Sequence, residues 1–519
     1  MQLTQAIHRA AATTPAAIAT VCAGRRRSWA EVRDRIARVA GALKGLGVGE
    51  GDRIAILAMN ADRYFELYFA VPWANAVVVP MNVRWSVAEH VFSIEDSGAT
   101  VLVVDDTFLA AGRAVLAQCG GLRHAIHIGD GPTPEGFLAY EALADAGPAA
   151  PDARRSGGDL AGIFYTGGTT GFPKGVMLSH QSLWTSSLCI GAGIGLSAEL
   201  RYLHAAPMFH LADTGMTFAG TIFGGSHIFM PSFDAAAFLG LVEAERATHA
   251  LLVPTMIRLL LDCPDLAHRD ASSLSRLIYG ASPMAESLLR AAMTQLPHVG
   301  FAQAYGQTEL SPLATILGPE WHVLDGPKAG KLRSAGRPGL CVEIKIVDAE
   351  GAEVPQGSVG EVCARGPNTM LGYWNRPEQT AATLVDGWVH TGDGGYLDAD
   401  GFLYIVDRIK DMIVSGGENV FSAEVENALM QHEAVGECAV IGVPDDKWGE
   451  RVHAIVVPKA GRSVSADEIV SHCKALIAGY KCPRSVDVRA EALPKSGAGK
   501  ILKVDLRQPF WADRNRNVN

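Results

Sequence analysis

A glycine-rich stretch in the first half of the chain reads Tyr165-Thr166-Gly167-Gly168-Thr169-Thr170-Gly171-Phe172-Pro173-Lys174-Gly175. It follows an apolar segment at 161–166 and precedes an expected helix at 182–188. Glycines let the backbone approach a ligand closely, while the threonine hydroxyls and Lys174 add donors suited to a polyphosphate. The pattern therefore predicts a phosphate-binding loop at a strand end, with a glycine-rich structural turn as the alternative. It is not the common P-loop, because G-x-x-x-x-G-K-[ST] is absent.

Around this loop, short apolar runs alternate with helical patterns. The runs lie at 53–59, 76–80, 100–104 and 161–166. Ahead of them, Ser28 and Glu31 have capping-box spacing, and apolar residues then recur at helical intervals. Strands that alternate with helices predict a layered α/β fold. A strictly alternating segment at 342–346 predicts a half-exposed antiparallel strand, and 131–151 is expected to be a surface loop.

The length of 519 residues exceeds one ordinary core and predicts at least two domains. After about residue 407, two helical patterns, one capped by Ser422 and one begun by a capping box at 465–468, alternate with apolar runs. This change of pattern indicates a small α+β unit. We predict an N-terminal domain at 1–409 and a C-terminal domain at 410–519.

Composition excludes several classes of protein. Hydrophobic residues make up 48% and charged residues 19%, which is typical of a globular protein. The formal net charge of −10 argues against a nucleic-acid-binding surface. The nine cysteines show no metal-type spacing and suit a reducing compartment. With neither an export signal nor a run of about 18 apolar residues, the sequence predicts a cytoplasmic protein without a membrane span.

The glycine-rich stretch resembles the signature Y-T-S-G-T-T-G-x-P-K-G of the adenylate-forming (AMP-binding) superfamily, with Gly167 in place of serine. That superfamily includes acyl- and aryl-CoA synthetases, peptide-synthetase adenylation domains and beetle luciferases. Further blocks match in the same order, so the resemblance runs from about residue 20 to 508. They lie at 207–210, 280–283, 305–309, 388–393, 407–419 and 493–501. The resemblance implies a large N-terminal domain followed by a small, mobile C-terminal domain.

The chemistry of these blocks agrees with a nucleotide site. Tyr305 offers a stacking face for adenine, Glu309 a hard oxygen ligand for Mg²⁺, and Asp393 a carboxylate for the ribose hydroxyls. The resemblance implies a complete ATP/AMP site of Thr166, Gly167, Gly168, Thr169, Thr170, Gly171, Lys174, Gly280, Ala281, Ser282, Tyr305, Gly306, Thr308, Asp393, Arg408 and Lys500. It implies as catalytic residues Lys500, Thr169, Lys174, Glu309 and His210. In isolation, Arg408 and Lys500 would be read as solvated surface charges, and His210 as a structural histidine.

The resemblance also assigns residues to the second half-reaction. Lys410 lies where the family has its hinge between domains. Ala498 replaces a serine in the C-terminal lysine block. Contacts to CoA are expected from Gly416, Gly417, Trp448, Tyr480 and Lys481.

The expected function is an ATP-dependent acyl-CoA ligase that uses ATP, Mg²⁺ and CoA. The expected acyl pocket contains His210, Ala212, Gly280, Ala304 and Gly306. Because the segments around these residues hold no lysine or arginine, the sequence predicts an apolar monocarboxylate, a medium- or long-chain fatty acid before an aryl or arylpropenoic acid. A stand-alone adenylation protein that loads a separate carrier protein, a non-catalytic nucleotide sensor and a homodimer stay open as alternatives.

Overall fold

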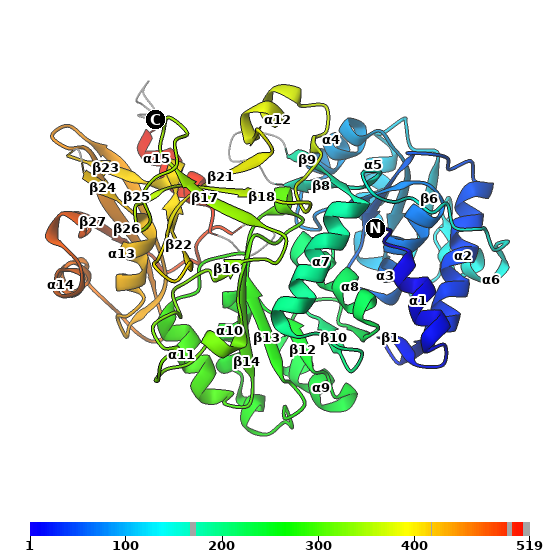
Figure 1. Ribbon diagram of the computed structural model, residues 1–519, viewed down its shortest axis with the longest axis horizontal. Helices are drawn as coiled ribbons and strands as arrows, with labels where there is room; N and C mark the ends of the chain where they lie inside the picture. The colour runs from blue at the N-terminus through cyan, green and yellow to red at the C-terminus, as the bar shows by residue number, and fades with distance from the viewer. Residues whose placement is uncertain (167–172, 417, 496–500, 512–519) are drawn as a thin grey trace.

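The computed structural model describes residues 1–166, 173–416, 418–495 and 501–511. Three sheets form the N-terminal part, and a fourth forms a smaller body at the opposite end of the molecule from helices α2 (Trp29–Gly45) and α6 (Tyr140–Ala146) (Figure 1). This is the layered α/β architecture with a small α+β C-terminal unit that the sequence predicts.

The first sheet carries the ends of the glycine-rich stretch. Its strands, in spatial order, are β19 (Gly372–Tyr373), β9 (Lys174–Ser179), β8 (Leu160–Thr166), β4 (Val77–Pro80), β3 (Arg53–Leu57), β5 (Ala99–Val104), β6 (His124–His127) and β7 (Leu138–Ala139). Strands β4 and β8 are parallel, with Val78 opposite Gly162, whereas β8 and β9 form an antiparallel hairpin. The carboxyl ends of β4 and β8 therefore lie at one edge of the sheet.

The second sheet is largely parallel. Its strands, in spatial order, are β16 (Arg337–Pro338), β15 (Thr315–Leu317), β14 (Gly300–Tyr305), β13 (Arg276–Gly280), β12 (His249–Leu251), β10 (Arg201–His204), β11 (Ser226–Phe229), β1 (Ile18–Cys22) and β2 (Arg25–Ser28). Gly280 pairs with Ala304 at the carboxyl ends of β13 and β14. These two strand ends therefore present neighbouring loops.

The two remaining sheets are smaller. The third contains β17 (Glu343–Val347), β18 (Gly360–Arg365), β21 (Trp388–Leu397), β20 (Leu384–Val385) and β22 (Leu403–Arg408). The C-terminal sheet contains β24 (Glu418–Val420), β23 (Ile413–Ser415), β26 (Gly449–Pro458), β25 (Val435–Asp445) and β27 (Ser485–Val488).

Helices cover the sheets, and two of them lie between the large ones. Phe164 of β8 shares one core with Leu183 of α7 (His180–Ile194), while Ile190 of α7 and Met216 of α8 (Leu211–Phe223) share another with Ile278 of β13. The remaining helices are α1 (Gln5–Thr13), α3 (Asp62–Trp73), α4 (Val87–Ser97), α5 (Leu109–Leu116), α9 (Ala235–Glu245), α10 (Pro254–Leu261), α11 (Glu286–Gln295), α12 (Pro377–Thr383), α13 (Ser422–Leu429), α14 (Ala466–Leu476) and α15 (Lys503–Trp511).

A buried polar network fastens the start of α8 to the second sheet. Asp213, in the first turn of α8, accepts hydrogen bonds from the Tyr202 hydroxyl at 2.8 Å and from Nδ1 of His204 at 2.6 Å. His204 Nε2 lies 2.9 Å from Nδ1 of His227, whose Nε2 lies 3.2 Å from the Thr221 hydroxyl. Burial, with His204 beside it, holds the pKa of His227 well below its usual range. Because buried polar groups need partners, this network fixes where α8 begins.

Local predictions largely agree with the structure, with three corrections. The capping box at Ser28 begins α2, but Ser422 does not cap α13: it is the first helical residue, and its amide donates to Asp407 at 2.5 Å. Strand β9, which pairs with β8, comes before the helix expected at 182–188. The stretch 131–151 is not only loop, since it contains β7 and α6.

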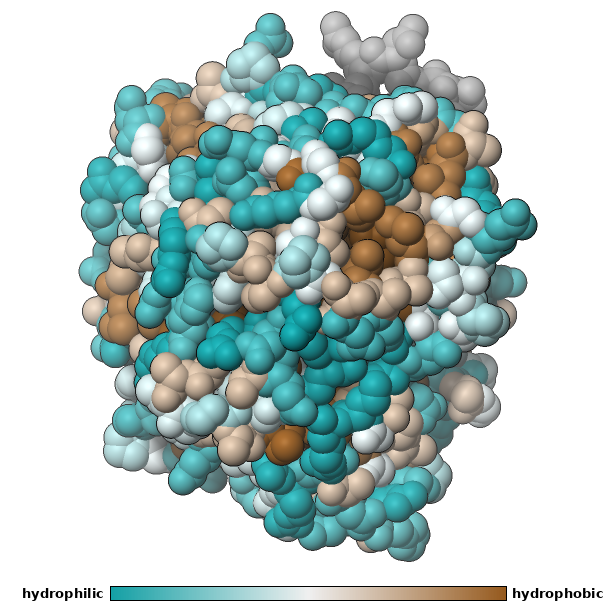
Figure 2. Space-filling model, turned by 90° about the vertical axis from the view of Figure 1, so that its right-hand side faces the viewer, coloured by the Kyte–Doolittle hydropathy of each residue, from teal (hydrophilic) through white to brown (hydrophobic). Residues whose placement is uncertain are grey.

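The molecular surface fits a globular protein. The face on the side of α2 and α6 is mainly hydrophilic, with separate hydrophobic patches (Figure 2). Among the described residues, no helix combines the length and apolar character needed to span a membrane.

Candidate active site

The glycine-rich loop closes a hairpin between two sheet strands. Thr166 of β8 pairs directly with Lys174 of β9, so the described residues on either side of the glycine-rich stretch meet at one point of the sheet. The Tyr165 hydroxyl donates to Asp96 at 2.7 Å, and Arg376 donates to the same carboxylate at 3.1 Å. These contacts anchor the strand that leads into the loop. Some predicted site residues lie outside the described part of the chain: Gly167, Gly168, Thr169, Thr170, Gly171, Gly417 and Lys500.

Glu309 contacts β19, the strand that pairs with β9 of this hairpin. It sits in the short turn η3 (Thr308–Leu310), which the predicted phosphate ligand Thr308 begins. Oε1 of the buried Glu309 carboxylate accepts the Tyr373 hydroxyl at 2.7 Å, and Lys174 Nζ lies 5.2 Å from the centre of the Tyr373 ring. Burial and the Glu309 charge raise the pKa of Tyr373. The Tyr373 contact leaves Oε2 of this carboxylate as the atom suited to a hard cation.

The predicted ribose ligands meet on the third sheet. Asp393 and Arg408 are cross-strand partners on β21 and β22, with 3.4 Å between Arg408 Nε and Asp393 Oδ1. The Tyr305 hydroxyl donates to Asp393 Oδ2 at 2.8 Å, and burial together with Asp393 raises the pKa of Tyr305 well above its usual range. The structure therefore brings together three predicted nucleotide ligands that lie 88 and 15 residues apart in the sequence.

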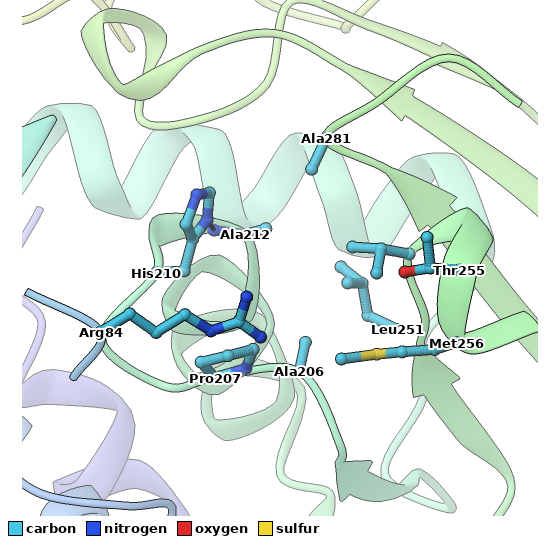
Figure 3. Close-up of a pocket in the computed structure, with 10 residues that line it drawn as sticks. Arg84, Ala206, Pro207, His210, Ala212, Leu251, Thr255, Met256 and Ala281 are labelled. Carbon is cyan, nitrogen blue, oxygen red and sulfur yellow. Dashed lines mark hydrogen bonds between the residues drawn. The ribbon is translucent and has the colours of Figure 1, made fainter. Parts of the chain in front are cut away.

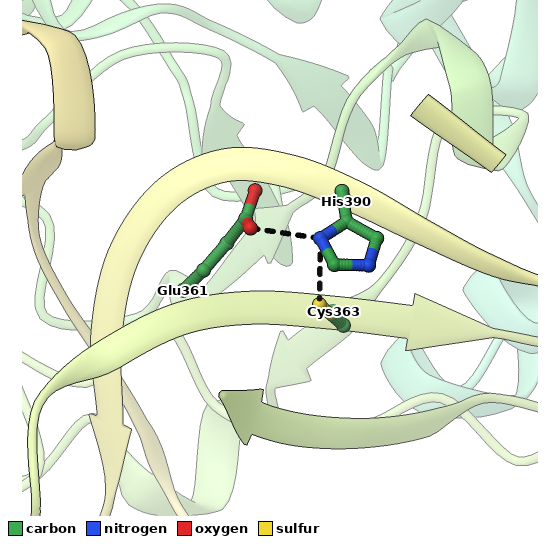
Figure 4. Close-up of side chains that lie close together, drawn as sticks. All are labelled: Glu361, Cys363 and His390. Carbon is green, nitrogen blue, oxygen red and sulfur yellow. Dashed lines mark hydrogen bonds and ion pairs between the residues drawn. The ribbon is translucent and has the colours of Figure 1, made fainter. Parts of the chain in front are cut away.

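A glutamate that sequence reasoning missed holds the Asp393 segment. Glu361 on β18 accepts the Gly392 amide at 2.9 Å through Oε1 and lies 2.8 Å from Nδ1 of His390 through Oε2 (Figure 4). Cys363, the cross-strand partner of His390, contacts the same ring nitrogen at 3.6 Å, and burial and Glu361 raise the pKa of its thiol to about 12. One side-chain atom of each of these three residues, a carboxylate oxygen, the thiol sulfur and a ring nitrogen, lies within 4.8 Å of the other two. This group positions the backbone next to Asp393.

We expect Glu361→Ala to raise the KM for ATP roughly 10-fold with a smaller change in kcat, because two hydrogen bonds to a charged acceptor are lost. Steady-state kinetics in ATP would measure this. Glu361→Gln is the matched control, since its amide oxygen can still accept from the Gly392 amide. An unchanged KM in Glu361→Ala would show that the strand pairing alone places Asp393.

A cavity of about 50 Å³ lies beside the start of α8. The predicted residues His210, Ala212 and Ala281 line it, together with Leu251 and Met256 (Figure 3). His210 Nδ1 accepts the Ala212 amide at 3.4 Å, and burial lowers the pKa of the imidazole. The wall is thus mostly apolar, with a neutral histidine at the start of the helix.

Two predicted pocket glycines are packed against backbone. A Cβ at Gly280 would lie 2.3 Å from the carbonyl oxygen of Ala304, and one at Gly306 would lie 2.0 Å from that of Pro312. Glycine is needed at both positions for this close approach. Gly280, Ala304 and Gly306 are not among the residues that line the cavity, and their acyl-pocket role stays a prediction. Ser282 follows in the loop after β13, next to the cavity wall.

The predicted hinge residue Lys410 lies in the short turn η5 (Ile409–Asp411), between the third and C-terminal sheets. Its carbonyl accepts a hydrogen bond from Arg507 of α15 at 3.4 Å, and Arg507 also pairs with Glu450 at 2.6 Å. Lys503, at the start of α15, pairs with Glu426 of α13 at 2.7 Å. Helix α15 is therefore held to the C-terminal sheet and its helix.

The predicted CoA residues divide into two neighbouring groups. A Cβ at Gly416 would lie 2.5 Å from the Trp448 ring, and the Gly416 amide donates to the Trp448 carbonyl at 2.8 Å. Tyr480 and Lys481 lie in the turn η6 (Gly479–Lys481). Arg484, shortly after this turn, lies 4.4 Å from the centre of the Trp448 ring and was not among the predicted residues.

Sequence reasoning also missed Asp96, Tyr373 and Arg84. Asp96 and Tyr373 touch predicted site residues only through tertiary contacts, and no pattern around them indicates this. Arg84 lines the cavity because it follows β4, which is the parallel neighbour of β8, and the sequence pattern does not show which strands are neighbours.

Comparisons with known proteins identify related sequences over nearly the whole chain. The family model described as AMP-binding enzyme matches residues 7–374, and that of the AMP-binding enzyme C-terminal domain matches 424–500. The chain is 39% identical to a feruloyl-CoA synthase of Amycolatopsis sp., over 97% of this chain and 98% of that protein. It is 36% identical to the fatty acid–[acyl-carrier-protein] ligase ScoC of Streptomyces coeruleorubidus, over 98% and 95%.

A solved structure shows the same architecture. The crystal structure of the anthranilate CoA ligase AuaEII in complex with anthranoyl-AMP superposes with a TM-score of 0.91 at 28% identity, over 99% of this chain and 98% of that one. These matches confirm the fold and the enzyme class, an acid–thiol ligase. The chain belongs to the AMP-binding enzyme family.

Proposed function

We propose that this protein is an ATP-dependent acyl-CoA ligase for a compact carboxylic acid. The observation that carries the proposal is that neighbouring strands connect the acid cavity to the predicted nucleotide site. Ala281 in the cavity wall follows Gly280, which pairs with Ala304 next to Tyr305, and the Tyr305 hydroxyl binds Asp393. An acid in the cavity and a ribose on Asp393 would therefore both lie near the adjacent carboxyl ends of β13 and β14.

The reaction has two steps. A carboxylate oxygen of the acid attacks the α-phosphorus of ATP, and pyrophosphate leaves with the electron pair of the broken P–O bond. The CoA thiolate then attacks the acyl carbonyl, and AMP leaves. Positioning and neutralisation of charge carry most of the catalysis, so no side-chain nucleophile is needed. Lys174 and Lys500 would supply fixed positive charge, and Glu309 would hold a Mg²⁺ ion that offsets phosphate charge.

The size of the cavity favours a compact acid over an extended one. Its volume of about 50 Å³ is small for an aryl acid and smaller still for the medium- or long-chain fatty acid that the sequence suggests first, so a longer chain would require more of the lining to move. The names of two similar proteins, a feruloyl-CoA synthase and an anthranilate CoA ligase, point to aromatic acids. We therefore place aryl and short-chain acids before long-chain fatty acids.

A panel of acids with ATP and CoA tests this proposal by AMP release. It would contain benzoate, cinnamate and indoleacetate beside straight-chain acids from butyrate to palmitate. We expect kcat/KM to be highest for compact acids and to fall roughly fourfold per methylene that no longer fits the cavity. A kcat/KM that rises steadily towards palmitate would contradict the compact pocket.

A second candidate is transfer to a carrier protein, because ScoC, a similar protein, is named as an acyl-carrier-protein ligase. The same acid tested with CoA and with a phosphopantetheinylated carrier protein would separate the two acceptors.

All nine cysteines are free thiols, which supports a reducing, cytoplasmic location.

A further inference from the structure

Arg84 comes from a segment that the sequence motifs do not include. It follows strand β4, whose carboxyl end lies beside that of β8 because the two strands are parallel neighbours. Strand β8 leads into the glycine-rich loop at its own carboxyl end. The segment that carries Arg84 and the predicted phosphate loop therefore leave the sheet at the same edge.

The side chain of Arg84 reaches the acid cavity from this edge. Its guanidinium points into the space between His210 and Pro207 on one side and Leu251 and Met256 on the other (Figure 3). Among the described residues that line the cavity, Arg84 is the one fixed charge, since the others are apolar side chains, Thr255 and a histidine. Burial lowers the pKa of His210, so this imidazole is neutral near pH 7.

Every candidate substrate of the proposed reaction brings a carboxylate to this cavity. Moving an ionised carboxylate from water into an apolar site is costly unless a counter-charge meets it. A guanidinium matches a carboxylate in shape and can bind it through two parallel N–H···O bonds. Arg84 also follows a strand end next to that of β8, so a carboxylate bound to it would lie at the edge of the sheet where the predicted phosphate loop begins.

We propose that Arg84 binds the reacting carboxylate of the acid before adenylation. The inference rests on the proposed ligase function and adds to it a substrate-binding residue from outside the motif blocks. Since the acyl-adenylate no longer carries a free carboxylate, Arg84 should matter for the first half-reaction and little for the second.

The test compares Arg84→Met and Arg84→Lys with wild type, using the acid with the highest kcat/KM in the panel. Acid-dependent exchange between pyrophosphate and ATP should lose roughly 10- to 100-fold in kcat/KM for the acid in Arg84→Met, with partial recovery in Arg84→Lys. Thioester formation from supplied acyl-adenylate should stay close to wild type in both. Arg33→Met, which removes an exposed arginine paired with Asp34 on α2, is the matched control and should change neither rate.

Equilibrium binding distinguishes this role from a structural one. Wild type should bind the acid more tightly than the primary alcohol of the same skeleton, and Arg84→Met should lose that preference while binding the alcohol unchanged. Equal losses for acid and alcohol, or a raised KM for ATP with an unchanged KM for the acid, would overturn the assignment. Because binding is measured without turnover, it decides the role of Arg84 even if wild type shows no exchange with any acid, a result that would instead refute the ligase function.

Discussion

Lys500→Ala is expected to lower the rate of acyl-adenylate formation by ~10²–10³-fold and to leave thioester formation from supplied acyl-adenylate close to wild type. The residue lies in the segment 496–500, outside the described residues, and its role is a proposal from the family resemblance. Negative charge builds between carboxylate and α-phosphate as they react, and one positioned ammonium stabilises it. During thiol attack the negative charge develops instead on the acyl carbonyl oxygen and the leaving AMP, and the family resemblance implies that the mobile C-terminal domain has by then moved Lys500 away from the site. Single-turnover assays of the two half-reactions measure the difference.

Lys495→Ala is the matched control, because Lys495 directly precedes this segment and its ammonium pairs with Glu437. The residues on either side of the segment are joined by a hydrogen bond of 2.9 Å from the Leu502 amide to the Pro494 carbonyl, which neither substitution removes. Lys495→Ala should therefore retain adenylation. If Lys500→Ala adenylates the acid at nearly the wild-type rate, the assignment is wrong.

Glu309→Gln is expected to reduce acyl-adenylate formation by ~10²-fold or more and to raise the Mg²⁺ concentration needed for half-maximal rate. The carboxylate is buried, and with Oε1 bound to the Tyr373 hydroxyl, Oε2 is left for a cation. An amide of the same shape keeps an acceptor for Tyr373 but loses the charge that a hard cation prefers. Titration of the exchange rate with Mg²⁺ at saturating ATP measures both effects.

Tyr373→Phe serves as the control for geometry. It removes the hydrogen bond to Glu309 but keeps the ring that lies near Lys174, so the loss should be about 10-fold, as for other residues that orient a ligand. If the rate of acyl-adenylate formation falls equally in both variants and their Mg²⁺ dependence is unchanged, Glu309 supports the fold of the site and does not hold the cation.

Much of the site could be predicted because its chemistry is concentrated in short blocks. Tyr305, at the end of β14, and Asp393, within β21, are recognisable from residue type and the order of the blocks, and the structure joins them by a hydrogen bond of 2.8 Å. Strands β3, β4, β5 and β8 were also predictable, since buried parallel strands are short apolar runs.

What could not be predicted depends on contacts between distant segments. Ser422 is a good helix cap by type, yet its amide and hydroxyl are taken by Asp407 and Lys503. Arg84 enters the cavity only because β4 and β8 are adjacent, and strand order is not written in local periodicity. For this reason the sequence predicted a pocket without a cation, and the structure places an arginine in its wall.

The polar network at Asp213 bears on how the enzyme chooses among acids. Because Tyr202 and His204 tie the first turn of α8 to β10, the side of the cavity that carries His210 and Ala212 is rigid. An acid of the wrong shape would then clash with this wall and bind weakly, because moving α8 to admit it would break buried hydrogen bonds. New acid preferences would therefore arise by substitution of lining side chains outside α8, such as the unbranched and adaptable Met256, while α8 keeps its place.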